Sequence, residues 1–279
     1  MRKKSIKKIC IILFSVVFLI VAIFTTLSIG VSVADSSWQH VYPDYEKEDI
    51  VPLLQKESLT EEDYQMLYRQ TGLTKIGIDD LKANNKMVQA LILQTAFFKA
   101  QTVHCRNFAP FTYTEEITGY MPLTNLKDGD ILVSSSMHVS FLRYGHAALV
   151  VDAVQGLVLE IAEIGSLSRY DIASDFCDRA NFMVLRPNVS QDIIDQVVKY
   201  AKENLMGIPY DATVGVLSKK NQENLKGTQC AHLVWQAYKR YGVDLDSDGG
   251  AVVRPKDIAN SPYLSVVQVF GFDLEKLWK

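Results

Sequence analysis

The sequence predicts an α+β protein with a largely antiparallel sheet and flanking helices, preceded by a small helical region and an N-terminal membrane or signal segment. Three observations lead to this fold class. Short apolar runs separated by turn residues come after Met121, which is typical of hairpin-connected strands. Amphipathic helical patterns lie before and after these runs, an order that favours an α+β architecture. The third observation is that residues 9–34 contain no charged side chain.

Length and composition exclude several protein classes. A chain of 279 residues with 48% apolar residues can bury a core, so it is not mainly disordered. Its 22% charged residues carry both signs, which disfavours a simple polyanion binder. Four cysteines in a chain of this length are too few for a disulfide scaffold.

Residues 1–34 are predicted to be a signal peptide or a membrane anchor. Basic residues open this segment: Arg2, Lys3, Lys4, Lys7 and Lys8. The uncharged run after them is long enough to span a bilayer and longer than most secretory apolar regions, which favours a retained anchor. It ends at Ala34 in a small-x-small pattern typical of signal cleavage before Asp35. We therefore expect an exported protein, anchored on the outer face of the cytoplasmic membrane or secreted after cleavage.

The exported part is acidic. Residues 1–34 hold five of the 29 Lys and Arg residues and none of the 32 Asp and Glu residues. Residues 35–279 thus have 24 basic and 32 acidic side chains, a formal charge of −8. We expect no nucleic-acid partner, because no basic stripe offers a phosphate-binding surface.

Residues 35–120 are predicted to form a stalk and then a helical region. Residues 35–56 lack periodicity and are interpreted as the stalk. A helix is predicted from Thr60 to Gly72, and a longer one from Asp79 to Cys105 with Met87, Leu91 and Phe98 on one face. This region is expected to pack against the C-terminal domain, or to act as a spacer before it. The boundary is placed in residues 107–120.

Residues 121–279 are predicted to be the chemically active domain. Four strands are expected, at Ile131–Ser134, Gly145–Asp152, Leu157–Ala162 and Phe182–Arg186. A helix capped by Ser190 is expected to end near Gly207, and another runs from Thr228 or Gln229 through Tyr241.

Cys230, His146 and Glu160 are the candidate catalytic residues. Cys230 falls in the first turn of a predicted helix, where free N–H groups and the helix dipole favour a thiolate. His146 begins an apolar strand and could act as a proton shuttle for that thiol. Glu160 lies on the next predicted strand and could orient the imidazole, as in a triad.

Other polar residues offer competing interpretations. Glu163 is a second candidate for orienting the imidazole, but strand alternation places it on the opposite face from Glu160. His138 and His232 are interpreted as ordinary surface or core histidines, and a zinc site is disfavoured for want of a fourth ligand and clear spacing. Asp244–Gly249 begins like a calcium loop, but Pro255 stands where the bidentate glutamate belongs. It is interpreted as an acidic turn.

Several motifs together resemble a known family. The segments GDILVSS, GHAALVVD, LVLE, GIPYD and QCAHLVWQAYKRYGVDLDSDGG occur in this order, with PKDI after them. They resemble the NlpC-type cysteine hydrolases of the circularly permuted, YiiX/YebB-like branch over residues 121–262. The resemblance implies a permuted papain-like fold with Cys230 as nucleophile, His146 as base, Glu160 as the acidic partner and Tyr210 as an oxyanion-site residue. Ala231 stands where many relatives have serine.

The implied function is that of an exported cysteine hydrolase, an amidase or peptidase that needs no metal or cofactor. Its expected substrates are cell-envelope peptide bonds such as those of peptidoglycan. An alternative is a lipid acyl hydrolase or acyltransferase, so the partner is a cell-wall peptide or a lipid-linked substrate, with the membrane engaged through residues 1–34. A third hypothesis is a catalytically inactive binding module.

Overall fold

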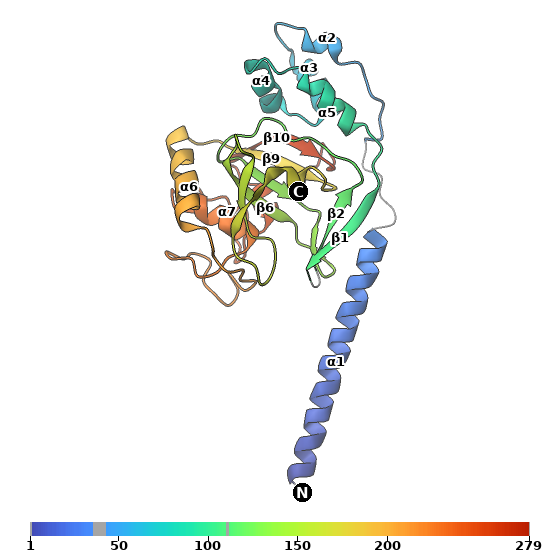
Figure 1. Ribbon diagram of the computed structural model, residues 1–279, viewed down its shortest axis with the longest axis vertical. Coiled ribbons are helices and arrows are strands. Elements are labelled where there is room, and N and C mark those ends of the chain that lie inside the picture. Colours follow the sequence, from blue (N-terminus) through green and yellow to red (C-terminus); the bar gives the residue numbers. More distant parts are fainter. Residues whose placement is uncertain (1, 36–42, 110–111, 279) are drawn as a thin grey trace.

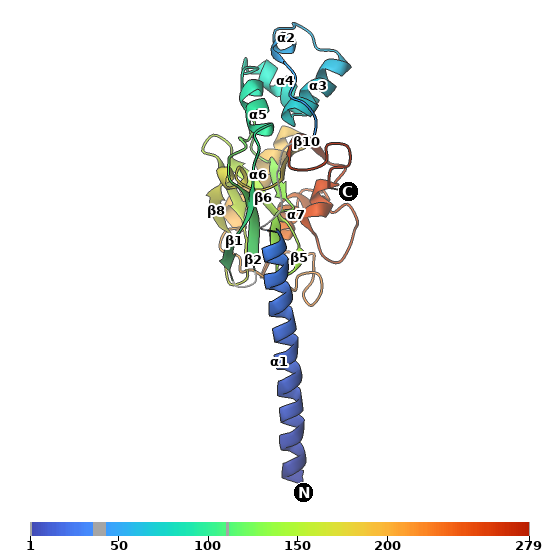
Figure 2. The ribbon, with the colours of Figure 1, turned by 90° about the vertical axis from the view of Figure 1, so that its right-hand side faces the viewer.

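The computed structural model describes residues 2–35, 43–109 and 112–278. A long helix, α1 (Arg2–Asp35), projects from a body made of helices and antiparallel sheets (Figures 1 and 2). The α+β class and the N-terminal apolar helix are therefore as the sequence predicts.

Helix α1 is long and apolar enough to cross a membrane. Its candidate span, Lys7–Val31, has 25 residues and a mean hydropathy of 3.0, and none of its most apolar stretch is buried in the protein. At 1.5 Å per residue the span is about 37 Å long, more than a hydrocarbon core of about 30 Å needs. Length and composition fit both a signal sequence and an anchor, and the predicted cleavage point after Ala34 lies at the end of this helix.

Four helices form the predicted helical region: α2 (Val51–Leu54), α3 (Glu61–Thr71), α4 (Lys75–Ala83) and α5 (Gln89–Phe97). The predicted start of α3 is confirmed, because Thr60 and Asp63 form a capping box. Its predicted end is confirmed at Gly72, which has φ +73°. The predicted helix from Asp79 to Cys105 is wrong: Asn85 has φ +54°, which interrupts the helix, and Cys105 lies in a strand.

The predicted stalk is only partly tested, because residues 36–42 lie outside the described chain. Residues 46–50 pack against the body instead of standing free. Ile50 is fully buried, and the Gln70 side chain accepts from Glu48 N and donates to Glu46 O. Residues 46–50 therefore do not belong to the predicted stalk, because they are bonded to the body.

The helical region packs on the edge strand β10 (Leu264–Phe270). Thr74 N donates to Val267 O at 3.0 Å, and Val269 N donates to Gly72 O at 2.8 Å. Leu67, Leu81 and Phe97 join the sheet in one apolar cluster. The expectation that this region packs against the C-terminal domain is confirmed.

The larger sheet has six strands in the order β10-β9-β3-β6-β7-β8. Its other strands are β3 (Ile131–Ser134), β6 (His146–Asp152), β7 (Leu157–Glu160), β8 (Arg169–Ile172) and β9 (Phe182–Pro187). All neighbours are antiparallel. The four predicted strands are present, with β7 ending at Glu160, two residues earlier than expected.

A smaller sheet occupies the segment that the sequence marks as a boundary. It has the order β1-β2-β4-β5 and contains β1 (Val103–Ala109), β2 (Thr112–Ile117), β4 (Met137–Val139) and β5 (Leu142–Arg143). Residues 107–109 and 112–117 of the predicted boundary thus belong to the paired strands β1 and β2, not to a linker.

Three helices lie between β9 and β10 in the sequence: α6 (Gln191–Asn204), α7 (Cys230–Lys239) and α8 (Pro255–Ala259). Alternate residues of β6 contribute to two different apolar clusters. Leu149 packs in the cluster that contains α6 and α7, whereas Val150 packs in the cluster that contains the helical region. Burial on both faces explains why β6 is apolar almost throughout.

Gly72 tests the junction between the helical region and the sheet. A Cβ there would lie 2.0 Å from Val269 O at a residue with φ +73°, whereas a Cβ at Gly156, with φ +67°, would meet nothing within 4 Å. Gly156→Ala should lower the free energy of unfolding by about 1–2 kcal/mol through backbone strain alone. Gly72→Ala should cost about 1–3 kcal/mol more, because the backbone contact must also shift. Urea unfolding of both full-length variants in mild detergent measures the difference, and equal losses would contradict this packing.

Candidate active site

His146 is held rigidly at the start of β6. The preceding Gly145 has φ +82°, and a Cβ there would lie 2.6 Å from Ser134 O. The N–H groups of Tyr144 and Gly145 both donate to Met137 O. The histidine itself is fully buried.

The imidazole of His146 is hydrogen-bonded to Glu160, with Nε2 and Oε2 2.6 Å apart. Sheet register explains the contact. Val150 pairs with Val158, and alternation places His146 and Glu160 on the same face as that pair. The predicted contact between the two side chains is present.

Charges around this pair keep both groups ionised. Burial alone raises the pKa of Glu160, but His146, Arg179 and Arg169 outweigh it and lower the pKa to about 2. Burial lowers the pKa of His146, but the Glu160 carboxylate and the Cys230 thiol together raise it to about 9. The imidazole thus holds its proton well above neutral pH.

Aromatic and cationic side chains enclose the pair on one side. The Phe176 ring, at the end of the short 3-10 helix η1 (Ala173–Phe176), stacks on His146 with centroids 5.9 Å apart. The Arg179 guanidinium lies 4.0 Å from the centroid of Phe176, and Arg169 lies 3.7 Å from Glu160 Oε1. This enclosure fixes the ring plane of His146.

Cys230 is the first residue of α7, as the sequence predicts. Its predecessor Gln229 is the N-cap and has extended backbone angles. The backbone N–H of a first-turn residue has no acceptor within its own helix, so it can bind an anion. Only 3% of Cys230 is exposed.

The thiol of Cys230 lies next to the imidazole, since their interaction contributes to the raised pKa of His146. Glu160 occupies Nε2, so Nδ1 is the ring nitrogen left for the thiol. Nδ1 is buried and forms no hydrogen bond of ordinary geometry with any residue that the structure describes. Burying a ring nitrogen without a hydrogen bond costs free energy, and a role in exchanging a proton with the Cys230 thiol explains why Nδ1 is left in this state.

Two tyrosines border the thiol. Burial, and after it the charge of Cys230, raises the pKa of the Tyr210 hydroxyl above its usual range, and the same causes raise the pKa of Tyr144. Tyr210 is positioned by a bridge to Thr228. The structure therefore brings the predicted Tyr210 close to Cys230.

Sequence reasoning missed Tyr144 and Gln229. The Tyr144 hydroxyl donates to Gln229 Oε1, and Gln229 Nε2 donates to Ala212 O at 3.1 Å. This chain of bonds ties the residue before Cys230 to the segment before His146. The sequence signal that could have found them is adjacency, because Gln229 directly precedes Cys230 and Tyr144 lies two residues before His146.

The competing candidates lie elsewhere. Glu163 sits in the turn after β7, where its carbonyl accepts from Ser166 Oγ. Both His232 nitrogens are engaged, Nδ1 with Thr228 and Nε2 with Lys220 O, so His232 is a core residue. His138 is also buried and pairs with Glu115 at 3.0 Å.

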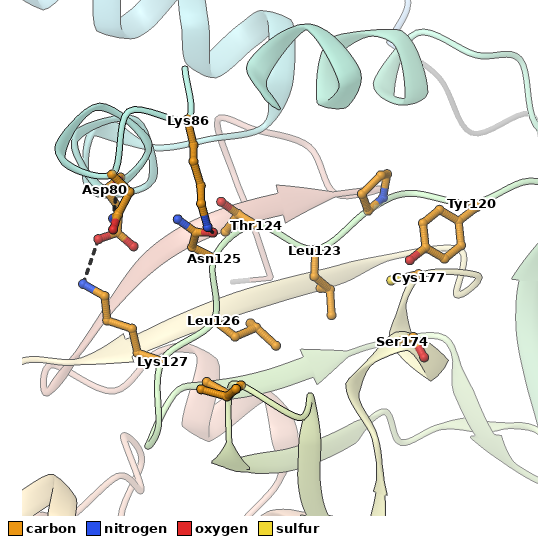
Figure 3. A pocket seen from close by; sticks show the side chains of 14 residues that line it. Asp80, Lys86, Tyr120, Leu123, Thr124, Asn125, Leu126, Lys127, Ser174 and Cys177 are labelled. Carbon is orange, nitrogen blue, oxygen red and sulfur yellow. Dashed lines mark hydrogen bonds and ion pairs between the residues drawn. The ribbon is translucent and has the colours of Figure 1, made fainter. Parts of the chain in front are cut away.

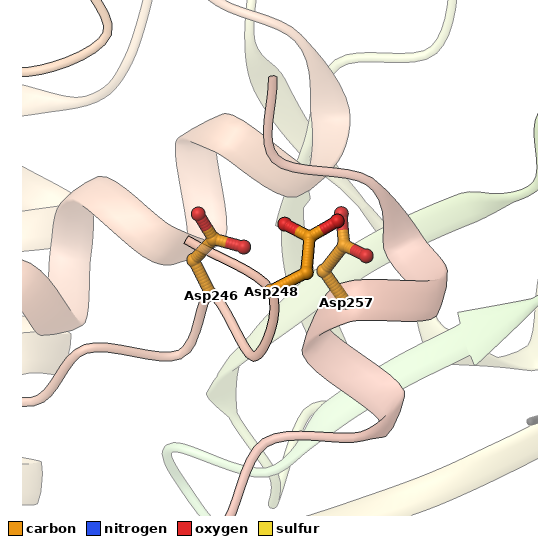
Figure 4. Close-up of side chains that lie close together, drawn as sticks. All are labelled: Asp246, Asp248 and Asp257. Atoms are coloured by element: carbon orange, nitrogen blue, oxygen red, sulfur yellow. The ribbon is translucent and has the colours of Figure 1, made fainter. Parts of the chain in front are cut away.

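The acidic turn at residues 244–249 is held by the protein's own cations. Carboxylates of Asp246, Asp248 and Asp257 approach within 4.8 Å of one another (Figure 4). Lys220 pairs with Asp246, and Arg254 pairs with both Asp248 and Asp257. These pairs fit the predicted acidic turn.

A cavity of about 530 Å³ lies away from Cys230, between the helical region and the sheet (Figure 3). Its lining includes Cys177 and Tyr120 but none of Cys230, His146 or Glu160. Burial raises the pKa of the Cys177 thiol, even though the Tyr120 hydroxyl acts in the opposite direction. A neutral thiol is a poor nucleophile, so Cys177 does not compete with Cys230.

Comparisons with protein-family models, curated proteins and solved structures give no match to this chain. The functional argument therefore rests on the geometry around Cys230.

The titration of His146 tests this geometry. The NMR shift of its ring protons should titrate near pH 9, and Glu160→Gln should lower the midpoint, because burial then acts against the remaining contribution of Cys230 without the charge of Glu160. In the wild type, the stability due to the raised pKa is complete below pH 6.5 and is lost as the pH rises through about 9. The stability due to the lowered pKa of Glu160 is present above pH 4.5 and is lost as the pH falls towards about 2.

The destabilisation by Glu160→Gln should accordingly be largest between pH 4.5 and 6.5. Glu163→Gln serves as the matched control and should leave the midpoint of His146 unchanged. A wild-type midpoint near 6.5 would contradict the buried ion pair.

Proposed function

We propose that this protein is an exported, thiol-dependent hydrolase with Cys230 as nucleophile, of the permuted papain-like, NlpC-type fold. The observation that carries the proposal is the buried His146–Glu160 pair, whose imidazole also interacts with the Cys230 thiol at a helix N-terminus. This arrangement supports nucleophilic catalysis, which uses a thiol, a base beside it and a group that orients the base.

The proposed chemistry is acyl transfer. In the reacting form the His146 imidazolium carries the proton that the Cys230 thiol has given up, and the thiolate attacks an amide or ester carbonyl. The N–H of Cys230 and the Tyr210 hydroxyl stabilise the oxyanion. The imidazolium then protonates the leaving group, and water releases the acyl-enzyme.

Glu160 acts in this scheme as a positioning residue. Its bond to Nε2 fixes the tautomer and the plane of the ring, and its charge stabilises the imidazolium. The raised pKa of His146 favours the imidazolium, so the proton given up by the thiol stays on the ring until the leaving group takes it, while the burial of the pair excludes water from it.

The proposed substrates are cell-envelope peptide bonds, such as those of peptidoglycan. Export of the body on an apolar α1 supports this class, because such a body meets the envelope. An acyl ester of a membrane lipid is the second candidate, supported by exposed apolar residues such as Leu142 and Leu217.

Replacement of Cys230 tests the proposal. Full-length protein in detergent should cleave wall peptides or acyl esters, and Cys230→Ala should abolish both cleavage and labelling of the reactive thiol by iodoacetamide. Cys177→Ala removes a different buried thiol and should change neither. His146→Asn should lower the rate by about 10²–10⁴, as expected for loss of a general acid–base group.

Tyr210→Phe separates the oxyanion site from the nucleophile. It should lower turnover by up to about 10²–10³ without reducing the labelling of Cys230. Full labelling of Cys230 with no cleavage of any peptide or ester would favour a binding module over an enzyme.

A further inference from the structure

Two segments at the end of the body from which α1 extends carry exposed apolar side chains. Leu142 is 59% exposed in the β4–β5 hairpin, and Val216 and Leu217 are 69% and 83% exposed in the loop between α6 and α7. The hairpin and this loop lie at the same end in both views (Figures 1 and 2). Apolar side chains grouped in this way usually mark an interaction surface.

Helix α1 sets the level of this surface relative to a membrane. A hydrocarbon core takes about 20 residues of helix, and about 20 residues counted from Ile9, the first residue after the basic cluster, end at Ser28. Ser28 is hydrogen-bonded to Ser140, and the rings of Phe24 and Phe141 are 5.3 Å apart. With residues 9–28 in the hydrocarbon core, the β4–β5 hairpin contacts α1 at the end of the core nearer the body.

The loop between α6 and α7 is held in place and not free to fold its apolar tip inward. Asp211 Oδ1 accepts from Thr213, and Asp211 Oδ2 accepts from Ser218. Behind the tip, Gly215 approaches the Ala251 backbone so closely that a Cβ would lie 1.9 Å from its oxygen. These contacts keep Val216 and Leu217 presented to the outside.

A third apolar segment joins the loop to the thiol. Ile164 and Leu167 are 69% and 54% exposed in the turn after β7. Leu167 forms a bridge with Pro209, whose neighbour Tyr210 borders Cys230. The β4–β5 hairpin is also connected to the candidate site. Tyr144, which follows β5, is hydrogen-bonded to Gln229, the residue before Cys230.

We propose that this end of the body docks on the surface of the bilayer that holds α1, with Leu142, Val216 and Leu217 in the interfacial region. The occupant is a lipid surface because α1 and its contact with the hairpin hold the surface at membrane level. A soluble partner would have to occupy the space that the bilayer takes. The docking goes beyond the proposed hydrolase and does not depend on it.

Depth-dependent fluorescence quenching tests the docking. Full-length Leu217→Trp and Val154→Trp are each reconstituted in phosphatidylcholine vesicles containing brominated acyl chains, and the emission of the wild type is subtracted. Val154 is the matched control. It is 98% exposed and follows the C-terminal end of β6, whereas the β4–β5 hairpin precedes the N-terminal end of that strand. We expect loss of the added emission from Leu217→Trp and no loss from Val154→Trp.

The outcome is independent of catalysis, because the same quenching is expected when Cys230→Ala is combined with Leu217→Trp. Leu142→Trp should be quenched like Leu217→Trp. Equal quenching at positions 217 and 154, or none at either, would overturn the proposal. So would a dimer in detergent that Leu217→Asp dissociates, because the surface would then be an interface between two copies of this chain.

Discussion

The hydrogen bond between His146 and Glu160 is the interaction on which the candidate site depends. It joins two neighbouring strands, and both partners are almost entirely removed from water. A buried charge without its partner is strongly destabilising, so neither group is stable there alone. The pairing of β6 with β7 is therefore a requirement of the site as well as of the sheet.

The remaining parts are brought to this pair by segments far apart in the sequence. Cys230 arrives at the N-terminus of α7, which packs on the opposite face of the sheet from the helical region. Tyr210 arrives from the loop after α6, and Tyr144 from the hairpin before β6. Strands and a helix hold the reacting groups, and rigid elements of this kind position such groups better than loops do.

Local signals in the sequence account for the elements that were predicted correctly. Thr60 with Asp63 marked the start of α3, and Gly72 its end, because caps act within a few residues. Apolar runs marked β3, β6 and β9, which are buried on both faces. Cys230, His146 and Glu160 were selected by chemistry and alternation, and the latter two lie in contact as expected.

The elements that were missed lack such signals. Strand β8 is mostly exposed, so no apolar alternation reveals it. Strand β10 pairs with β9 about 80 residues earlier, and the small sheet lies in a segment rich in turn residues. The break between α4 and α5 depends on Asn85, a residue type that adopts positive φ more readily than most but is not a reliable helix terminator.

Burial also explains how one site could work beside a membrane. Dissolved salt screens the interactions of exposed charges over a distance of about 10 Å, but it acts weakly on charge pairs in the protein interior. Because His146 is fully buried and Glu160 nearly so, their charges are set by each other and by Arg169 and Arg179, not by the ions near a bilayer. The exposed apolar residues can therefore meet lipid while the protonation of the imidazole stays fixed by the strands behind it.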